Sequence, residues 1–413
     1  MAKIVPFRAY RPKEGMESVI AALPYDVYNR EEALEVVKKN PYSFLAIDRA
    51  ETQFGPETDM YAPEVYEKAH EMLWQWIEEG TYIREEAPCY YLYRQIMDGR
   101  SQTGIVACAS IDDYQNQMIK KHENTRADKE EDRIRHVDIC NAQTGPIFLA
   151  YRAQERIQSI IEAVLATVPV YDFVSDDGIG HQVWVVKDSA QVEGIRQAFE
   201  NLDSIYIADG HHRCASAVKV GLKRREANPQ FTGEEEFNFF LSVLFPDEEL
   251  KIMDYNRVVK DLNGLTKEEF LAKIGEHFQV KKTGVEPYYP KEKGTFGMYL
   301  EDEWYELTAC EDIRNEDSVD GLDVSLLQNY LLYPILGIED PKTDKRIDFV
   351  GGIRGLKELE RRVHTDMKVA FSMYPTSIGE LFAVADDHRL MPPKSTWFEP
   401  KLRSGIFVHS LKD

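Results

Sequence analysis

The chain has 413 residues and a formal net charge of −22, with 50 lysines and arginines against 72 aspartates and glutamates. A chain of this length is too long to fold around one ordinary hydrophobic core, so two or three domains are expected. The acidity counts against the broad electropositive face that non-specific DNA binding requires, so we expect no DNA partner. No apolar run reaches the length of a membrane span and the first residues lack a signal-peptide pattern. We therefore expect a cytoplasmic protein without membrane contact.

Two patterns in the first quarter of the chain predict regular structure. Residues 63–79 place apolar side chains at the three-and-four spacing of an amphipathic helix. Residues 98–100, Asp-Gly-Arg, join two runs rich in Tyr, Ile and Val that span 89–97 and 101–111. Because Asp-Gly supplies the positive φ of a tight turn, these runs predict a β-hairpin.

A polar stretch, 121–142, follows the hairpin and becomes helical in pattern. Thr125, with Asp128 three residues later, resembles a capping box at the start of that helix. Further along, the periodicity predicts a helix over 153–165, strands over 168–173 and 182–186, and a helix over 189–201.

The second half begins with a short apolar run, 205–208, a turn, and a helical stretch, 214–227. Residues 237–245 are almost continuously apolar, as in a buried central strand. The remaining expectations are a strand pair over 248–260, a helix over 265–278 opened by Thr266, a loop over 281–293, strands within 294–309, and helices over 324–332 and 353–363. This order predicts an α+β fold with mixed α/β layers.

The turn between strand and helix reads Asp209-Gly-His-His-Arg213. A strand–turn–helix presents backbone N–H groups and the positive end of a helix dipole, which suits an anion such as phosphate. Gly210 lets the backbone approach a ligand, and the histidines and Arg213 add donors. Asp209 adds a carboxylate able to hold a metal or accept a proton. The alternative is a solvated surface turn in which Asp209 caps the helix.

A second group starts at His122-Glu123 and continues through Thr125 into Arg126, Lys129 and Arg133. On a helix these three cations share one face, which is unusual in so acidic a chain. The alternative is that Glu130, Glu131 and Asp132 neutralise them on a solvated helix.

A third group, Lys394-Ser395-Thr396, resembles half of a phosphate site without the glycines of a P-loop. The alternative there is an extended segment held by the preceding prolines. Arg8 and Arg11, with Tyr25 and Asp26, form a fourth and weaker group on a proline-rich backbone.

The residues of these groups carry two family resemblances. The segment 205–213 is similar to the ligand-binding turn of the ParB/sulfiredoxin superfamily, which binds nucleotide phosphates and belongs to the active site in free serine kinases. The Pro-Phe-Arg opening, the Leu-Pro-Tyr-Asp-Val, His-Glu-x-Thr and Asp-Gly-His-His-Arg motifs, and the Met-Pro-x-Lys-Ser-Thr segment together resemble domain-of-unknown-function family 1015, whose members are often labelled ParB-like or SpoOJ-like. Cys214 and Asn256 depart from that pattern, which puts a direct role for either in doubt.

These resemblances imply a ParB/sulfiredoxin-like nucleotide-binding core over 151–280. An N-terminal α+β portion over 1–150 and a C-terminal α+β portion over 281–413 would elaborate it. The function that follows is a kinase-like phosphotransferase that binds a nucleotide and acts on a small hydroxylated, serine-like metabolite. ATP or ADP would be the phosphoryl donor, with Mg²⁺ as cofactor. The alternatives are a ParB-like nucleotide-dependent regulatory module and a metal-dependent hydrolase using His122, Glu123, His211 and His212.

Under the leading hypothesis each candidate residue has a role. Asp209, His212 and Glu123 are the candidate catalytic residues, with Asp26 an alternative to Glu123, and Asp209 is also the candidate Mg²⁺ ligand. The candidate nucleotide- and phosphate-binding residues are Gly210, His211, Arg213, Arg8, His122, Lys129, Arg133, Lys394, Ser395 and Thr396.

Overall fold

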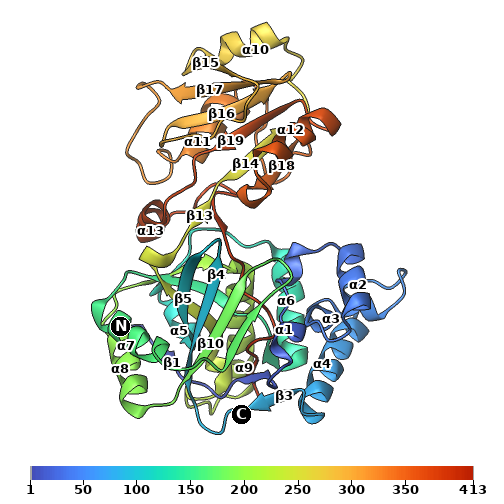
Figure 1. The fold of residues 1–413 in the computed structure, drawn as a ribbon, viewed down its shortest axis with the longest axis vertical. Helices are drawn as coiled ribbons and strands as arrows, with labels where there is room; N and C mark the ends of the chain where they lie inside the picture. Colours follow the sequence, from blue (N-terminus) through green and yellow to red (C-terminus); the bar gives the residue numbers. More distant parts are fainter. Residues whose placement is uncertain (1, 413) are drawn as a thin grey trace. The chain divides into compact units, whose positions relative to one another are not determined.

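The computed structural model describes residues 2–412 and divides the chain into two compact units (Figure 1). Unit 1 comprises Met1–Leu250 and Pro400–Asp413, and unit 2 comprises Lys251–Glu399. The end of the chain thus returns to the unit in which it began. Neither boundary expected from the sequence coincides with this division, because residues 150 and 151 lie within one strand of unit 1 and residues 280 and 281 within one strand of unit 2.

A mixed sheet forms the centre of unit 1, with the described strands in the order β6-β11-β8-β12-β5-β4-β10-β9 and β1 paired to β5. The β12–β8 and β11–β6 pairs are parallel and the other pairs are antiparallel. The strands are β1 (Ile4–Val5), β4 (Tyr90–Met97), β5 (Arg100–Ser110), β6 (Ile119–Lys120), β8 (Ile147–Tyr151), β9 (Tyr171–Val174), β10 (Gly180–Val186), β11 (Ile205–Asp209) and β12 (Phe239–Pro246). Two small ladders, β2 (Tyr10–Pro12) with β3 (Tyr82–Arg84) and β7 (Ala142–Gln143) with β21 (His409–Ser410), complete the strands of this unit.

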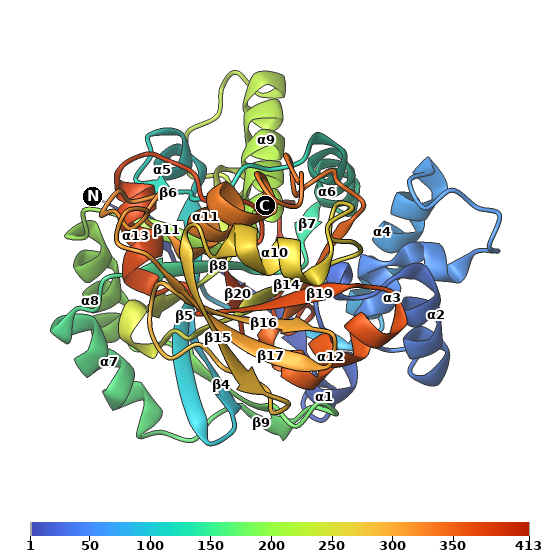
Figure 2. The same cartoon turned by 90° about the horizontal axis from the view of Figure 1, so that it is seen from above.

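Helices of unit 1 build two apolar cores. One core joins the sheet to α7, α8 and α9 through buried side chains such as Ile161, Phe199 and Val218. The other core is formed by α1, α2, α3 and α4 around Phe44 and Leu73. These helices lie at one side of the sheet (Figures 1 and 2). The helices and 3-10 turns are α1 (Glu17–Ile20), η1 (Tyr25–Val27), α2 (Arg30–Lys39), α3 (Leu45–Asp48), η2 (Ala50–Gln53), α4 (Pro63–Glu78), α5 (Ile111–Gln115), α6 (Ala127–Cys140), α7 (Glu155–Leu165), α8 (Ser189–Glu200), α9 (His211–Ala227), η3 (Glu236–Asn238) and η4 (Asp247–Glu249).

Unit 2 has a sheet in the order β15-β17-β16-β19-β14-β18, with its own buried cluster around Trp304, Val258 and Leu359. Its strands are β13 (Ile252–Met253), β14 (Tyr255–Val259), β15 (Phe278–Gly284), β16 (Thr295–Leu300), β17 (Glu303–Ala309), β18 (Ile347–Gly351), β19 (Val369–Met373) and β20 (Trp397–Phe398). Its helical segments are α10 (Lys267–Ile274), α11 (Asp323–Leu327), the π-helical η5 (Gln328–Leu332), η6 (Gly352–Arg354), α12 (Leu356–Thr365) and α13 (Ile378–Asp386).

The expected α+β class with mixed α/β layers is confirmed, and so are several of its elements. The 89–111 hairpin exists as β4 and β5, which pair from Met97 and Arg100 outward. The helix predicted over 63–79 is α4, and the buried strand predicted over 237–245 is β12, whose residues are all buried. Thr266 opens α10 as expected, and the structure adds a capping box between Thr266 and Glu269.

Three local expectations are wrong. Thr125 makes no capping box with Asp128, because its Oγ1 donates to Glu130 Oε2 at 2.7 Å and α6 begins after Arg126. The strand pair expected over 248–260 does not form, since β13 pairs with β20 and β14 lies between β18 and β19. The loop expected over 281–293 begins later, because β15 continues to Gly284. For β13 and β14 the pattern was local, whereas the strands that pair with them lie elsewhere in the chain.

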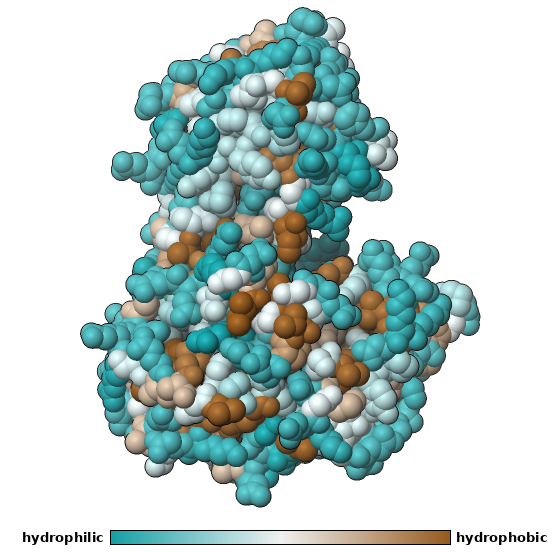
Figure 3. Space-filling view, viewed as in Figure 1, coloured by the Kyte–Doolittle hydropathy of each residue, from teal (hydrophilic) through white to brown (hydrophobic). Residues whose placement is uncertain are grey.

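The surface agrees with the acidic composition. On the face shown in Figure 3 both units are mainly hydrophilic, and apolar residues lie in small separate groups. Within residues 2–412, none of the helices combines the length and the apolar character that crossing a bilayer would take.

Gly221 allows α9 to pack closely against its neighbours in unit 1. A Cβ at this position would lie 2.4 Å from the carbonyl oxygen of Phe237 and 2.8 Å from Ile111 Cδ1. We expect Gly221→Ala to lower the free energy of unfolding by about 1–3 kcal/mol, because the Phe237 backbone can move away from the added methyl group only at a cost in free energy. Urea unfolding measures the change in this free energy. Gly194→Ala on α8 is the control, since its Cβ would meet only the flexible end of Ile160, and equal costs for the two variants would contradict the close approach.

Candidate functional site

The strand–turn–helix expected around residue 209 is present in unit 1. Strand β11 ends at Asp209, Gly210 adopts φ +88°, and α9 starts at His211. That left-handed conformation suits glycine. Gly210 is the N-cap of α9 and no side chain of the described residues caps the helix. The N–H groups of its first turn, with the positive end of the helix dipole, are therefore left for an anion.

Asp209 is held by the turn and by the returning C-terminal segment. Its Oδ1 accepts from the Gly210 N–H at 2.8 Å, and its Oδ2 accepts from Lys401 Nζ at 2.8 Å. Burial opposes ionisation, yet Lys401, Arg213 and the Gly210 amide hold the pKa of Asp209 well below its ordinary value. The side chain is 45% exposed. Both oxygens are engaged, so the geometry fits the positioning of Lys401 better than the ligation of Mg²⁺.

His122 and His211 meet beside this turn. Their ring centroids lie 4.5 Å apart in an edge-to-face arrangement, and the residues are 1% and 6% exposed. Neither ring nitrogen of His122, nor Nε2 of His211, has a hydrogen-bond partner among the described residues. Burial lowers the pKa of His122 to about 4 and that of His211 well below its usual value. Both rings are therefore neutral at pH 7.

The residues before α6 also reach the turn. The backbone N–H of Arg126 donates to Nε2 of His212 at 2.9 Å. The Arg126 side chain is exposed and pairs with Asp128 at 2.8 Å. Glu123 is half-buried and lines neither of the pockets described below.

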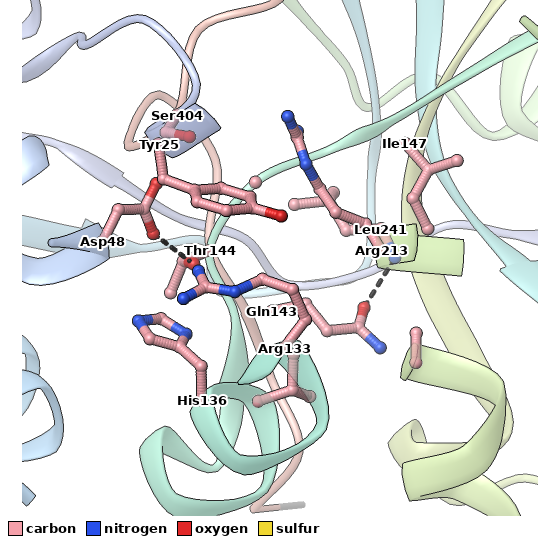
Figure 4. A pocket seen from close by; sticks show the side chains of 13 residues that line it. Tyr25, Asp48, Arg133, His136, Gln143, Thr144, Ile147, Arg213, Leu241 and Ser404 are labelled. Carbon is pink, nitrogen blue, oxygen red and sulfur yellow. Dashed lines mark hydrogen bonds between the residues drawn. The ribbon is translucent and has the colours of Figure 1, made fainter. Parts of the chain in front are cut away.

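A polar pocket in unit 1 adjoins the N-terminal turn of α9 (Figure 4). It holds about 440 Å³ of space, its open mouth included. Its lining comes from segments far apart in sequence: Tyr25, Asp48, Arg133, His136, Val137, Gln143, Thr144, Gly145, Ile147, Arg213, Ala217, Leu241 and Ser404. We call it the arginine pocket, because Arg133 and Arg213 are its two cations.

Tyr25 lies between the two guanidinium groups (Figure 4). The Arg133 Cζ atom is 4.0 Å from the Tyr25 ring centroid and that of Arg213 is 5.9 Å from it. Arg213 Nη1 donates to the carbonyl oxygen of Pro146 at 3.0 Å, and its Nη2 lies 3.9 Å from Asp26 Oδ1. Burial raises the pKa of Tyr25 to about 12, so its hydroxyl stays protonated.

Arg133 is a buried cation, 8% exposed. Its Nε donates to Asp132 Oδ2 at 2.9 Å. Burial would lower its pKa, but the charges of Asp132, Tyr25 and Asp48 raise it overall, so the guanidinium stays charged. Arg126, Lys129 and Arg133 do not form one exposed basic face, because Arg126 precedes the helix and Arg133 points into the protein.

A second pocket, with about 370 Å³ of space, its open mouth included, shares a wall with the arginine pocket. Tyr25, Asp48, Arg133 and His136 line both, and Lys129 lines only the second. The structure thus brings Lys129, Arg133 and Arg213 of the predicted residues to one pair of pockets.

The other predicted cations lie elsewhere. Arg8 Nε donates to the carbonyl oxygen of Glu85 at 3.0 Å, and Arg8 does not line either pocket. The segment 394–396 belongs to unit 2. There the Lys394 carbonyl accepts from Arg257 Nη2 at 3.0 Å, and Ser395 Oγ donates to the carbonyl of Pro392 at 2.7 Å. This segment is held within unit 2, where residues 393–394 form a turn and Lys394 adopts φ +59°, so it is not the extended segment of the alternative.

Sequence reasoning missed several residues of the site. Asp48 is buried in α3, Thr144 and Gly145 precede β8, and Ser404 belongs to the returning C-terminal segment. A usable signal exists for Asp48, which ends the apolar run Leu45-Ala-Ile and is only 5% exposed. A buried carboxylate is a reason to search for a site.

The ligand set of a metal-dependent hydrolase does not assemble. His122 and His211 touch, but residues 2–412 contain no group of three His, Cys, Asp or Glu side chains placed to hold a metal ion. His212 is engaged by the backbone of Arg126 instead. That alternative therefore lacks the converging ligands that it requires.

The fold and the site define a mixed α/β protein whose polar pocket adjoins a strand–turn–helix junction. Its sequence matches the model of a family described as protein of unknown function (DUF1015) over residues 4–325. The chain belongs to this family. A comparison with curated proteins gives no match.

Solved structures with detectable likeness are distant. A free serine kinase mutant in complex with ADP is 14% identical, with 74% of this chain and 92% of that chain covered and a TM-score of 0.36. SbnI with C-terminal truncation from Staphylococcus aureus is 12% identical, covering 75% and 89%, with a TM-score of 0.39. A conserved hypothetical protein from Pyrococcus furiosus is 16% identical, covering 75% and 96%, with a TM-score of 0.35. Scores this low carry no functional argument.

The neutral His122 makes the stability of unit 1 depend on pH. The unfolded chain binds a proton at this histidine below a pH of about 6.5, whereas the folded protein does so only near 4. Between these values the unfolded state holds more protons, so the free energy of unfolding falls as pH falls, by about 1.4 kcal/mol per pH unit and histidine.

His122→Phe keeps a ring against His211 but removes the titrating group. We expect it to reduce the slope by the contribution of one histidine, about 1.4 kcal/mol per pH unit. Urea unfolding of the variant and the natural protein at pH 7, 6 and 5 measures the difference, in which titrating groups remote from His122 cancel. An unchanged slope would show that His122 binds its proton equally in the folded and unfolded states.

Proposed function

We propose that unit 1 binds a nucleotide and transfers a phosphoryl group to a small hydroxylated metabolite. One observation carries this proposal: in a chain of net charge −22, two arginines enclose Tyr25 in a pocket beside the uncapped N-terminus of α9. Phosphoryl transfer needs positioning and neutralisation of phosphate charge more than covalent help from the protein. The similarity of the Asp209–Arg213 turn to phosphate-binding turns of the ParB/sulfiredoxin superfamily supports the same function.

The phosphates would lie between the α9 N-terminus and the two guanidinium groups. Gly210 allows close approach of the backbone, and Arg133 and Arg213 supply planar donors that match phosphate oxygens. His211, with His122 packed against its ring, would fix the first residue of α9. The phosphoryl donor would be ATP or ADP, and an accompanying Mg²⁺ would supply further neutralisation of the phosphates.

Lys401 is the third cation of this arrangement. Asp209 holds its ammonium group next to Gly210, where it would face the same phosphates. In this role Asp209 is a positioning residue. His212 belongs to the turn, Glu123 follows His122, whose ring packs against His211, and Asp26 lies beside Arg213. They are available to orient the acceptor.

Arg213 offers the first test. We expect Arg213→Ala to weaken nucleotide binding by about 1.5–3 kcal/mol, the usual worth of a hydrogen bond to a charged group. Isothermal titration with ATP, ADP and AMP, with and without Mg²⁺, measures the dissociation constant. Arg135→Ala is the matched control, because Arg135 is an exposed arginine of α6 paired with Glu131. Equal affinity of Arg213→Ala and the natural protein, with cooperative unfolding intact, would remove Arg213 from the site.

The Asp209–Lys401 pair gives a second test through a double-mutant cycle. Lys401→Met leaves the Asp209 carboxylate uncompensated beside the phosphates, so we expect roughly tenfold weaker binding, about 1.4 kcal/mol. Adding Asp209→Asn to that variant removes the repulsion and should restore most of the affinity. Titration of the same nucleotides reads both effects. Additive losses in the double variant would contradict the proposed placement of the phosphates.

Turnover separates the enzyme from a ParB-like regulatory module. A thermal-shift panel of ATP, ADP, CTP and GTP identifies the nucleotide, since a ligand of the folded state raises its stability. Phosphorus NMR of that nucleotide with hydroxylated acceptors then detects transfer. Binding without any transfer would favour the regulatory module, and no binding would reject both.

A further inference from the structure

The second pocket has a composition of its own. Its lining is Tyr25, Asp48, Arg49, Ala50, Glu51, Met60, Val65, Tyr66, Lys129, Asp132, Arg133 and His136. Most of its charges are neutralised by one another. Arg49 Nε donates to Glu51 Oε1 at 2.6 Å, while Asp132 accepts from Arg133 at 2.9 Å and from the Tyr66 hydroxyl at 2.9 Å.

Two charged groups of this lining stand outside those pairs. Lys129 is half-buried and makes no ion pair within residues 2–412. Asp48 is 5% exposed, and its Oδ1 accepts from Thr144 Oγ1 at 2.8 Å. Asp48 lines both pockets, and its charge acts on Arg133. A buried carboxylate that adjoins two pockets is placed to accept a proton from a ligand.

We propose that the second pocket holds the phosphoryl acceptor, a small molecule with a hydroxyl and an anionic group, and that Asp48 is the catalytic base. This inference rests on the proposed function, because the donor nucleotide would occupy the arginine pocket. Asp48 lies on the wall common to both pockets, which is where an acceptor hydroxyl must approach the terminal phosphorus. Lys129 pairs with the anionic group of the acceptor.

The transfer step balances with these groups. Asp48 Oδ2 takes the proton of the acceptor hydroxyl while the hydroxyl oxygen bonds to the terminal phosphorus. The bond from that phosphorus to the bridging oxygen breaks, and its electron pair leaves with the shortened nucleotide. Arg133 and Arg213 neutralise the charge on the phosphoryl oxygens. The proton passes from Asp48 to solvent after the product leaves.

Other candidate bases fit this place less well. Both oxygens of Asp209 are engaged by Gly210 and Lys401. His136 shares the common wall, but its Nε2 lies 3.3 Å from the carbonyl oxygen of Ile47.

The test compares Asp48→Asn with the natural protein and with Asp203→Asn, an exposed aspartate before β11 that lines neither pocket. The amide oxygen of the introduced asparagine can still accept from Thr144, so the fold is expected to survive, and thermal unfolding checks it. Lys129→Met is the second variant, because a half-buried cation without an ion pair can be replaced without stranding a partner. Isothermal titration gives the nucleotide affinity of each protein.

Transfer is followed by phosphorus NMR with four acceptors: water, glycerol, D-glycerate and L-serine. We expect Asp48→Asn to keep its nucleotide affinity within about twofold and to lose transfer by about a hundredfold or more, the usual worth of a general base. The natural protein should prefer glycerate and serine over glycerol. Lys129→Met should lose that preference through a higher KM for glycerate and serine.

Each of the other possible results contradicts one part of the proposal. If nucleotide binds and Asp48→Asn transfers at the natural rate, Asp48 is not the base. If nucleotide binds and the natural protein transfers to none of the four acceptors, the second pocket is not an acceptor site, while nucleotide binding stands. If no nucleotide binds, the proposed function fails and this inference with it.

Discussion

The stacking of Arg133 on Tyr25, with the guanidinium 4.0 Å from the ring centroid, is the interaction on which the site of unit 1 depends. It joins the turn η1 near the start of the chain to α6, and it forms the wall that the two pockets share. Asp132 pairs with the same guanidinium and is itself held by Tyr66 of α4. Loss of the ring would therefore affect α4, α6 and both pockets together.

The returning C-terminal segment completes this site. After unit 2 the chain re-enters unit 1 at Pro400, where Lys401 pairs with Asp209 and Ser404 lines the arginine pocket. The backbone of Ser404 also exchanges hydrogen bonds with Ala22, close to Tyr25 in sequence. The position of Tyr25 between two arginines thus depends on segments near both ends of the chain. A site of this kind cannot form until these two segments of unit 1 have come together.

The sequence predicts what depends on local patterns. Alternation and Asp-Gly chemistry locate the β4–β5 hairpin, and the run before Asp209 locates β11, Gly210 and α9. Of the site, it identifies Arg213 and Arg133 through motif and helical spacing. The sequence does not identify Asp48 and Lys401, because their roles depend on distant partners. Asp48 accepts from Thr144, 96 residues away, and Lys401 donates to Asp209, 192 residues away. The capping box expected at Thr125 fails for a local reason, because the N-cap of α6 is Arg126 and the Thr125 hydroxyl donates to Glu130.

The energetics of Arg133 bear on why such a site exists. A buried arginine–aspartate pair costs several kcal/mol of desolvation per ion, and a well-packed apolar pair is often as stable or more so. Arg133 is nevertheless buried and charged, and it lines the arginine pocket as well as pairing with Asp132. Stability alone gives no reason for this arrangement in unit 1. An anion that enters the arginine pocket does, because it would meet a guanidinium whose desolvation and orientation are already in place before binding.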